Sequence, residues 1–259
     1  MALNLRQTEI LNIARVEGRV VVEALADRFN VTLQTIRRDL TEMAEAGVLD
    51  RVHGGAVMRK GVSNIGYAAR RRMHEAAKTA IGRACAAAIP NNASMILNLG
   101  TTTEAVAREL LHHSNITVVT NNINVANILV ANESCEIMVA GGALRRSDGG
   151  LVGDLTTEFI KQFKVDFAVI GTSALDCDGD LLDFDLPEVR VSRAIIQQSR
   201  QTFLVADSSK LGRSAPVRLA SLSEIDAIFI DEPLPDALAQ RCIAWETAVH
   251  LACVAPSRK

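Results

Sequence analysis

The chain has 259 residues, of which 48% are hydrophobic and 22% charged, and its formal net charge is -2. This length is enough for one small and one medium domain, each with its own core. No apolar run approaches the roughly 20 residues that cross a bilayer, and the first residues lack the apolar core of a signal peptide. The composition argues against a membrane-spanning or secreted protein and predicts a globular protein of the cytoplasm.

The small net charge conceals two parts of opposite charge. Residues 1–72 hold 12 Lys or Arg against 8 Asp or Glu, a net of +4, whereas residues 73–259 have a net of -6. A basic N-terminal part is typical of a module that binds nucleic acid, with an affinity that falls as salt rises. The five cysteines are widely spaced and form no C-x-x-C pair. We therefore predict neither a disulfide framework nor a metal site, and no cofactor.

The first predicted element is a helix over residues 4–17. Asn4-Leu5-Arg6-Gln7 fits a capping box, in which the side chains of the first and fourth residues accept hydrogen bonds from each other's backbone N–H groups. Gly18 is expected to end the helix. Residues 19–21 predict a short strand.

Two further helical segments, over residues 22–29 and 31–47, are joined by a short turn and predict a helix-turn-helix unit. Thr32 is expected to cap the second helix, and Gly47 to end it in a left-handed conformation. The second helix of such a unit can enter a DNA major groove. Its apolar residues recur at helical spacing and predict a stripe that faces a core; they are Leu33, Ile36, Leu40, Met43 and Ala44.

The polar side chains at the start of this second helix suit DNA contact. Gln can pair with adenine and Arg with guanine, each through two hydrogen bonds, and both can bind phosphate. Taken alone, the Arg pair is more typical of a solvated helix face. The candidate DNA-binding residues of the helix are Thr32, Gln34, Thr35, Arg37 and Arg38.

The segment after this helix reads as a wing. Residues 48–52 and 56–57 predict two strands joined by a tight turn at His53-Gly54-Gly55, because glycine readily adopts the positive φ of a hairpin. His53 and Gly54 are further candidate DNA contacts, since little side-chain bulk separates this tip from a phosphate or the minor groove. The N-terminal part is therefore predicted to be a winged helix-turn-helix domain.

Small and polar residues over 59–66 interrupt the periodicity and mark a linker. We divide the chain into a DNA-binding domain over residues 1–58, a linker over 59–73 and a second domain over 74–259. Arg70-Arg71-Arg72 is typical of a solvated face, with contact to DNA phosphate as the alternative.

The second domain alternates short apolar runs with helical segments, which predicts an α/β fold with a parallel sheet covered on both faces. The predicted strands are residues 94–99, 116–120, 136–140, 167–171, 202–207, 225–231 and 248–252. The predicted helices are residues 74–89, 103–111, 124–131, 156–163, 186–199 and 235–245.

Ligands of an open parallel sheet bind beyond the carboxyl ends of its strands. Residues 100–103 precede a helix there, and the free N–H groups and positive dipole end of a helix attract phosphate, with Lys210 as a second positive group. Taken alone, that segment is equally typical of an ordinary helix cap. The candidate ligand-binding residues at these strand ends are Gly100, Thr101, Thr102, Thr103, Asn121, Asn122, Gly141, Gly142 and Lys210.

Asp185 and Glu188 are also candidate ligand-binding residues. Asp185-Leu186-Pro187-Glu188 fits a capping box, which explains both carboxylates without a ligand. The alternative is that carboxylates of this acidic segment, Asp183 and Asp185 in particular, bind ligand hydroxyl groups.

Q-T-I-R-R-D-L followed by H-G-G-A strongly resembles the DNA-binding region of DeoR-type bacterial repressors. L-G-T-T-T, V-T-N-N, A-G-G and D-S-S-K-x-G resemble the effector domain of the same family, whose fold is similar to that of sugar-phosphate isomerases. The resemblance implies double-stranded operator DNA as one partner and a phosphorylated small-molecule effector as another. In the branch that shares N-N-I-N-V-A-N, the implied effector is glycerol 3-phosphate. Symmetric operators favour a homodimer or homotetramer.

Three positions depart from the family pattern. Asn98 stands where Asp is usual, which weakens any carboxylate role at that strand end. Leu211 stands where Phe is usual, and Ser192 where relatives often carry Lys. The last change removes one anion contact and leaves Arg190 and Arg193 as substitutes.

We therefore predict a transcriptional repressor that a phosphorylated metabolite releases from its operator. One alternative is a sugar-phosphate isomerase with an added DNA-binding module, in which Glu188 or Asp183 would act as the base. Others are an activator that recruits polymerase with its ligand bound, and a response to a different sugar phosphate.

Overall fold

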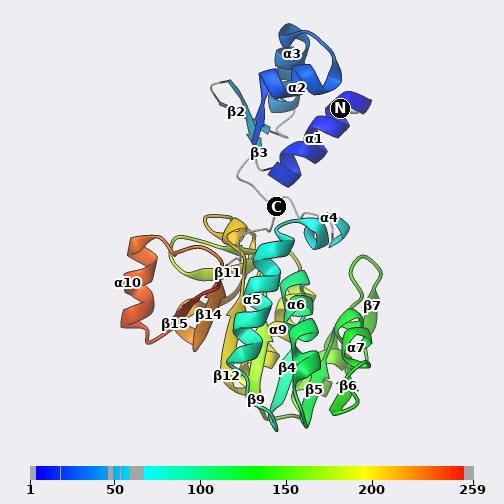
Figure 1. Ribbon diagram of the computed structural model, residues 1–259, viewed down its shortest axis with the longest axis vertical. Coiled ribbons are helices and arrows are strands. Elements are labelled where there is room, and N and C mark those ends of the chain that lie inside the picture. Colours follow the sequence, from blue (N-terminus) through cyan, green and yellow to red (C-terminus); the bar gives the residue numbers. More distant parts are fainter. Residues whose placement is uncertain (1–3, 18, 46–48, 53, 59–66, 254–259) are drawn as a thin grey trace. The chain divides into compact units, whose positions relative to one another are not determined.

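The computed structural model describes residues 4–17, 19–45, 49–52, 54–58 and 67–253. The chain forms two compact units, Met1–Ile65 and Gly66–Lys259, each of which is considered by itself (Figure 1). Across these described ranges, no helix has both the length and the apolar character needed to span a membrane.

The N-terminal unit is a winged helix-turn-helix, as predicted. Its elements are α1 (Leu5–Glu17), β1 (Arg19–Val21), α2 (Val22–Phe29), α3 (Leu33–Glu45), β2 (Leu49–Val52) and β3 (Gly55–Met58). The strands form an antiparallel sheet in the order β1-β3-β2. A Cβ on Gly55 would lie 2.0 Å from the carbonyl oxygen of Val20, so only glycine allows β1 this close to the wing. His53 and Gly47 lie outside the described residues.

The core of this unit explains how α3 is oriented. Ile36, Leu40 and Met43 are fully buried and pack with the apolar residues of α1 and α2. The predicted stripe is wrong at Leu33, which is 42% exposed because the first turn of α3 extends past this core. Asp39 is buried instead, although it is charged.

The larger unit is built on a seven-stranded sheet in the order β15-β14-β12-β9-β4-β5-β6, and all neighbouring strands run parallel. Its strands are β4 (Ser94–Leu97), β5 (Ile116–Thr120), β6 (Cys135–Val139), β9 (Val165–Ile170), β12 (Ser199–Val205), β14 (Ala227–Ile230) and β15 (Ala248–Leu251). Its helices are α4 (Tyr67–Arg72), α5 (Glu75–Ala87), α6 (Thr101–Glu109), α7 (Ile123–Leu129), α8 (Asp154–Ile160), α9 (Leu186–Gln197) and α10 (Asp236–Ala244), with short 3-10 turns at Leu110–His112, Ser208–Lys210 and Leu222–Glu224.

Alternate strand residues enter different cores, which confirms the prediction of a sheet covered on both faces. Met95 and Leu97 pack with α5, α6 and α7, whereas Ile96 between them packs with α8, α9 and α10. Helices lie on both sides of the sheet in Figure 1.

Several short elements were not predicted. They are the hairpin of β7 (Ala143–Arg145) and β8 (Gly150–Val152), and a small antiparallel sheet of β10 (Ala174–Leu175), β11 (Asp180–Asp183) and β13 (Val217–Ser221). Strands of two to five residues are too short to show a period of two clearly. Residues 67–72, within the expected linker, form α4 and belong to the larger unit.

The strand order places one crevice at the centre of the sheet. From β4 the chain proceeds to β5 and β6 on one side, and from β9 to β12, β14 and β15 on the other. The order therefore reverses between β4 and β9, and ligands of open α/β sheets bind beyond the carboxyl ends of the strands at such a point.

Candidate functional site

The N-terminal unit presents the start of α3 to solvent. The Thr32 hydroxyl accepts a hydrogen bond from the N–H of Thr35 at 3.2 Å, which confirms the predicted cap. Gln34, Arg37 and Arg38 are exposed, so their side chains are accessible to a ligand as large as DNA. Arg38 also bonds Glu42 at 2.9 Å, an exposed contact of the kind that contributes little stability.

Helix α1 fixes the orientation of α3. The predicted capping box of α1 is confirmed, because Gln7 N–H donates to Asn4 Oδ1 at 2.8 Å and Asn4 N–H donates to Gln7 Oε1 at 3.2 Å. The next contacts join the two helices: Arg6 Nε lies 2.5 Å from the Oδ2 of buried Asp39, and Gln7 Nε2 donates to Glu42 Oε2 at 2.8 Å. The exposed face of α3 is therefore held on a braced helix.

In the larger unit, a pocket occupies the crevice between β4 and β9. It is lined by Tyr67, Arg70, Leu99, Gly100, Thr101, Thr102, Asp148, Gly171, Thr172, Ser173, Asp183, Glu188, Val205 and Lys210. Five of the candidate ligand-binding residues meet here: Gly100, Thr101, Thr102, Glu188 and Lys210. The pocket thus joins sequence positions more than 100 residues apart.

One wall of the pocket can receive an anion. The first intrahelical bond of α6 runs from Glu104 N–H to Gly100 C=O, so the N–H groups of residues 101–103 precede it and have no helical partner. Such N–H groups, at the positive end of the helix dipole, bind phosphate well. The Thr103 hydroxyl donates to Gly100 C=O at 2.6 Å, so it stabilises this turn and does not line the pocket.

Lys210 adds a positive charge to the same pocket. Burial lowers its pKa to about 8, against the opposing effect of the nearby Asp207 carboxylate. Asp207 is itself buried and accepts hydrogen bonds from the N–H and hydroxyl of Ser209. A bound anion would stabilise the charged form of Lys210, because charge attraction opposes the effect of burial.

The other wall carries carboxylates. Asp183 is buried and accepts hydrogen bonds from the Ser173 hydroxyl at 3.1 Å and from Phe184 N–H at 2.7 Å. Burial raises the pKa of Glu188 to about 7, and the charge of Asp183 adds to this effect while Arg145 opposes it. These carboxylates can accept hydrogen bonds from ligand hydroxyl groups.

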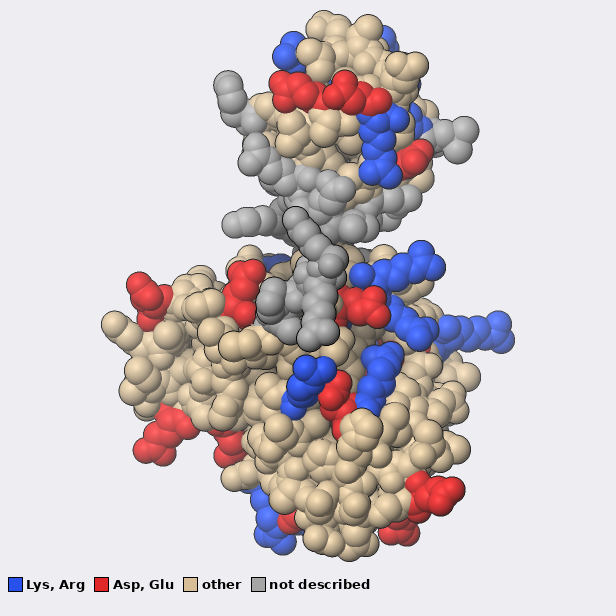
Figure 2. Space-filling model, viewed as in Figure 1, with Lys and Arg blue, Asp and Glu red and all other residues tan. Residues whose placement is uncertain are grey.

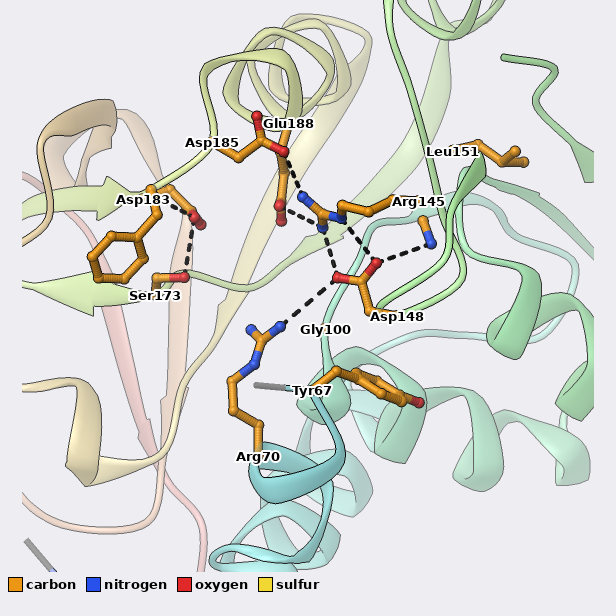
Figure 3. Close-up of polar contacts among 12 residues, drawn as sticks. Tyr67, Arg70, Gly100, Arg145, Asp148, Leu151, Ser173, Asp183, Asp185 and Glu188 are labelled. Carbon is orange, nitrogen blue, oxygen red and sulfur yellow. Dashed lines mark hydrogen bonds and ion pairs between the residues drawn. The ribbon is translucent and has the colours of Figure 1, made fainter. Parts of the chain in front are cut away.

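Arg145, in the hairpin that the sequence did not predict, joins three carboxylates (Figure 3). Its guanidinium bonds Asp148 at 2.7 and 2.9 Å, Asp185 at 2.7 Å and Glu188 at 2.7 Å. The predicted capping box of Asp185 and Glu188 is wrong, because no side chain caps α9. Both carboxylates bind the Arg145 guanidinium instead, since charge-assisted hydrogen bonds are stronger than bonds to neutral backbone N–H groups.

Tyr67 and Arg70 of α4 complete the pocket, and sequence analysis missed both as ligand-site residues. The Tyr67 hydroxyl donates to Glu104, and burial together with that contact raises the Tyr67 pKa to about 12. Arg70 Nη2 lies 3.8 Å from Asp148 Oδ2. Figure 2 shows basic side chains gathered over α4, whose last residues are Arg70, Arg71 and Arg72. The polar pattern around these residues is typical of a solvated segment and gave no signal of a pocket.

The remaining candidates lie elsewhere along the strand ends and have structural partners. Asn121 Nδ2 donates to Leu151 C=O at 3.2 Å, and Asn122 Oδ1 caps α7 by accepting from Asn124 N–H at 2.9 Å. Gly141 C=O accepts from the Thr156 hydroxyl at 2.7 Å, and a Cβ on Gly142 would lie 2.0 Å from that hydroxyl oxygen. These residues shape the loops around the pocket without lining it.

Two of the three departures from the family pattern contact each other. Asn98 and Ser192 are both 1% exposed, and Asn98 Nδ2 donates to Ser192 Oγ at 2.8 Å. In a chain with Asp and Lys at these positions, the same contact would join opposite charges. Here a neutral pair occupies it, so the two changes compensate each other electrostatically.

Both units of the chain match known protein families. The DeoR-like helix-turn-helix domain matches residues 6–61, and the DeoR C terminal sensor domain matches residues 73–232. This chain belongs to the DeoR family. Its N-terminal unit is thus a DNA-binding domain, and its larger unit is the sensor domain of a DeoR-family regulator.

Two curated relatives of this DeoR-family chain are named as repressors. The glycerol-3-phosphate regulon repressor of Escherichia coli (strain K12) is 45% identical over 235 residues, which cover 91% of this chain and 93% of that protein. The repressor of the same name from Haemophilus influenzae is 46% identical over 229 residues, which cover 88% and 89%. The chain is therefore a DNA-binding transcriptional repressor and not an isomerase.

Solved structures are similar at lower identity. Ribose 5-phosphate isomerase A of Neisseria gonorrhoeae shares 10% identity and a TM-score of 0.39, over 52% of this chain and 53% of its own. The β subunit of eIF2B from Chaetomium thermophilum shares 14% identity and a TM-score of 0.44, over 60% of this chain and 48% of its own.

Proposed function

We propose that this DeoR-family repressor senses glycerol 3-phosphate in the pocket between β4 and β9, and that the bound effector releases the protein from its operator. The polarity of the pocket carries this proposal. Lys210 and the first-turn N–H groups of α6, which have no partner within the helix, form one wall, and Asp183 and Glu188 form the other. Glycerol 3-phosphate has a phosphate at one end and two hydroxyl groups at the other, so one molecule can satisfy both walls.

The relatives support the choice of effector, because the repressors that share 45% and 46% identity with this chain are named for the glycerol-3-phosphate regulon. A larger sugar phosphate offers the same phosphate with additional hydroxyl groups, and neither of these relatives is named for such a ligand. We infer that such ligands bind more weakly.

For DNA, we propose that Gln34, Thr35, Arg37 and Arg38 contact base edges or phosphates from the exposed start of α3, and that Thr32, His53 and Gly54 are further DNA contacts. Gln and Arg suit adenine and guanine respectively. A repressor of this kind reads symmetric half-sites as a homodimer or homotetramer, because the symmetry of the operator mirrors that of the protein.

Isothermal calorimetry on the full chain without DNA tests the effector assignment. Glycerol 3-phosphate, glycerol, inorganic phosphate, ribose 5-phosphate and fructose 6-phosphate are titrated in turn. We expect glycerol 3-phosphate to bind best, and glycerol to bind least because it lacks the anion. Tighter binding of a hexose phosphate would overturn the effector assignment.

The pKa of Lys210 predicts a pH dependence of this binding. Between pH 8.0 and 9.5 a pKa of about 8 takes Lys210 from half charged to mostly neutral, while a phosphate ester, with its second pKa near 6, keeps its charge. Glu188, with a pKa of about 7, is mostly ionised throughout this range. We expect the effector affinity to fall by about tenfold over this interval.

Lys210→Gln is the control for the pH measurement. This variant should bind the effector more weakly at pH 8.0 and lose the decline toward pH 9.5, because the titrating amine is gone. A wild-type affinity that stays constant across the interval would rule out a phosphate contact by Lys210.

A further inference from the structure

We propose that α4 carries the signal from the effector pocket to the DNA-binding unit, and that Arg70 is the residue of α4 that holds the effector's anion. This inference rests on the proposed function and adds the element that couples the two activities. In the sequence, α4 directly follows residues 59–66, which lead from the DNA-binding unit. Two residues of this helix, Tyr67 and Arg70, line the pocket.

The guanidinium of Arg70 is incompletely satisfied by the residues that the structure describes, which points to a role in binding an anion. Its Nε is buried and finds no acceptor among the residues that the structure describes. A buried N–H without a partner is costly, and native proteins rarely retain one without a reason. A ligand anion in the pocket would supply the acceptor.

The contact of Arg70 with Asp148 is loose. Arg70 Nη2 lies 3.8 Å from Asp148 Oδ2, whereas a charge-assisted hydrogen bond is typically about 2.8 Å long. Arg145 already bonds both oxygens of Asp148, at 2.7 and 2.9 Å (Figure 3). Arg70 is thus the weaker partner of this carboxylate and is free to turn toward an anion held at the start of α6.

Contacts along α4 make its position depend on the pocket. Lys78 Nζ donates to the carbonyl oxygens of Arg70 and Met73, and so ties α4 to α5. The Tyr67 hydroxyl donates to Glu104 at 2.9 Å and accepts from Asn124 Nδ2 at 3.0 Å. Asn124 Nδ2 also donates to the carbonyl oxygen of Asp148 at 2.9 Å.

The network links both sides of the proposed anion site. Glu104 belongs to α6, whose first turn receives the anion, and Asp148 belongs to the hairpin beside it. An effector that draws Arg70 away from Asp148 breaks one of the contacts that hold α4 against the larger unit. By linkage, the arrangement that binds the effector better must be the one that binds the operator less well.

Arg70→Ala tests the proposal in the full chain. The operator dissociation constant is measured by anisotropy, without effector and at saturating glycerol 3-phosphate, and the ratio of the two values is the coupling factor. We expect this variant to bind the effector at least about tenfold more weakly by calorimetry, and to have a coupling factor close to 1. Arg70→Lys keeps the charge but not the Nε donor, so we expect intermediate values.

Arg72→Ala is the matched control, because it removes the same charge from an exposed position of the same helix. Arg72→Ala should leave the effector affinity and the coupling factor at their wild-type values. Intrinsic fluorescence of Trp245, the single tryptophan, verifies that the larger unit of each variant is folded.

A spectroscopic readout follows α4 directly. Tyr67 is the single tyrosine of the chain, so incorporation of 3-fluorotyrosine gives one ¹⁹F resonance, located in α4. We expect this resonance to shift when glycerol 3-phosphate saturates the wild-type protein. In Arg70→Ala, saturating effector should shift it less.

The outcomes separate this inference from the proposed function. Failure of every phosphorylated ligand to release wild-type protein from its operator would contradict the proposed function. If glycerol 3-phosphate releases the wild type, and saturating effector releases Arg70→Ala to the same extent, the proposed function stands and the role of α4 is overturned. An unchanged ¹⁹F resonance on effector binding also overturns that role.

Discussion

Arg145→Ala should lower the free energy of unfolding of the larger unit by about 3 kcal/mol or more. Arg145 bonds Asp148, Asp185 and Glu188, and the Asp148 and Glu188 side chains are only 9% and 16% exposed. Removal of the cation leaves these carboxylates partly buried without a counter-charge, and loss of one partner of a buried ion pair costs about 3–5 kcal/mol. Denaturant unfolding followed by Trp245 fluorescence measures the loss in this unit alone.

The loss should grow with pH. Burial raises the folded-state pKa of Glu188 to about 7, and Arg145 opposes this rise, so the variant raises that pKa further. A carboxyl whose pKa is higher in the folded state destabilises the fold progressively as pH increases from its unfolded value of about 4.3. The difference between variant and wild type is therefore expected to be larger at pH 8 than at pH 5.

Arg200→Ala is the control for this experiment, since Arg200 is 65% exposed and lies 3.6 Å from Asp166. Surface ion pairs contribute about 0–1 kcal/mol, so this variant should unfold much like the wild type. A comparable loss in both variants, with no dependence on pH, would show that Arg145 does not organise the carboxylate wall.

Arg37→Ala should weaken operator binding by roughly tenfold to a hundredfold, because a base contact by Arg contributes about 1–3 kcal/mol. Arg37 lies on the exposed face of α3, opposite the buried residues that hold this helix in the core. Anisotropy of labelled duplexes from the region upstream of the gene measures the effect. The effector affinity should not change.

The salt dependence of the Arg37 variant identifies the type of contact. A lost base contact relaxes the preference between operator and unrelated DNA, whereas a lost phosphate contact weakens both and lowers the salt slope by about 1. Arg83→Ala, a 68% exposed position on α5, removes the same charge elsewhere and serves as control. Equal operator affinity of wild type and Arg37→Ala would remove Arg37 from the interface.

The architecture could be predicted from sequence because the longer elements repeat their apolar residues clearly. Predicted strand 116–120 and helix 186–199 differ from the observed β5 and α9 by at most two residues at either end. The β7–β8 hairpin was missed because three-residue strands carry too little pattern. That omission concealed Arg145, and with it the reason why Asp185 and Glu188 do not cap α9.

The residues of the candidate site could be predicted only where they follow the carboxyl ends of the parallel strands. Residues 100–102 and Lys210 follow strands of a parallel sheet, and the carboxyl ends of such strands meet at one edge. Asn121 and Gly141 satisfy the same rule, yet the pocket lies at the β4–β9 reversal and not at β5 or β6. Tyr67 and Arg70 come from a helix before β4, the first strand of the larger unit, where no sequence rule places a ligand contact.

Release of a labelled operator by glycerol 3-phosphate tests the central claim most directly. The full-length protein is bound at low salt to a fluorescent duplex from the region upstream of the gene, and anisotropy is recorded as each phosphorylated metabolite is added. We predict that glycerol 3-phosphate lowers the anisotropy at the lowest concentration and that glycerol leaves it unchanged. Binding that is equally tight with and without every phosphorylated ligand would contradict the account.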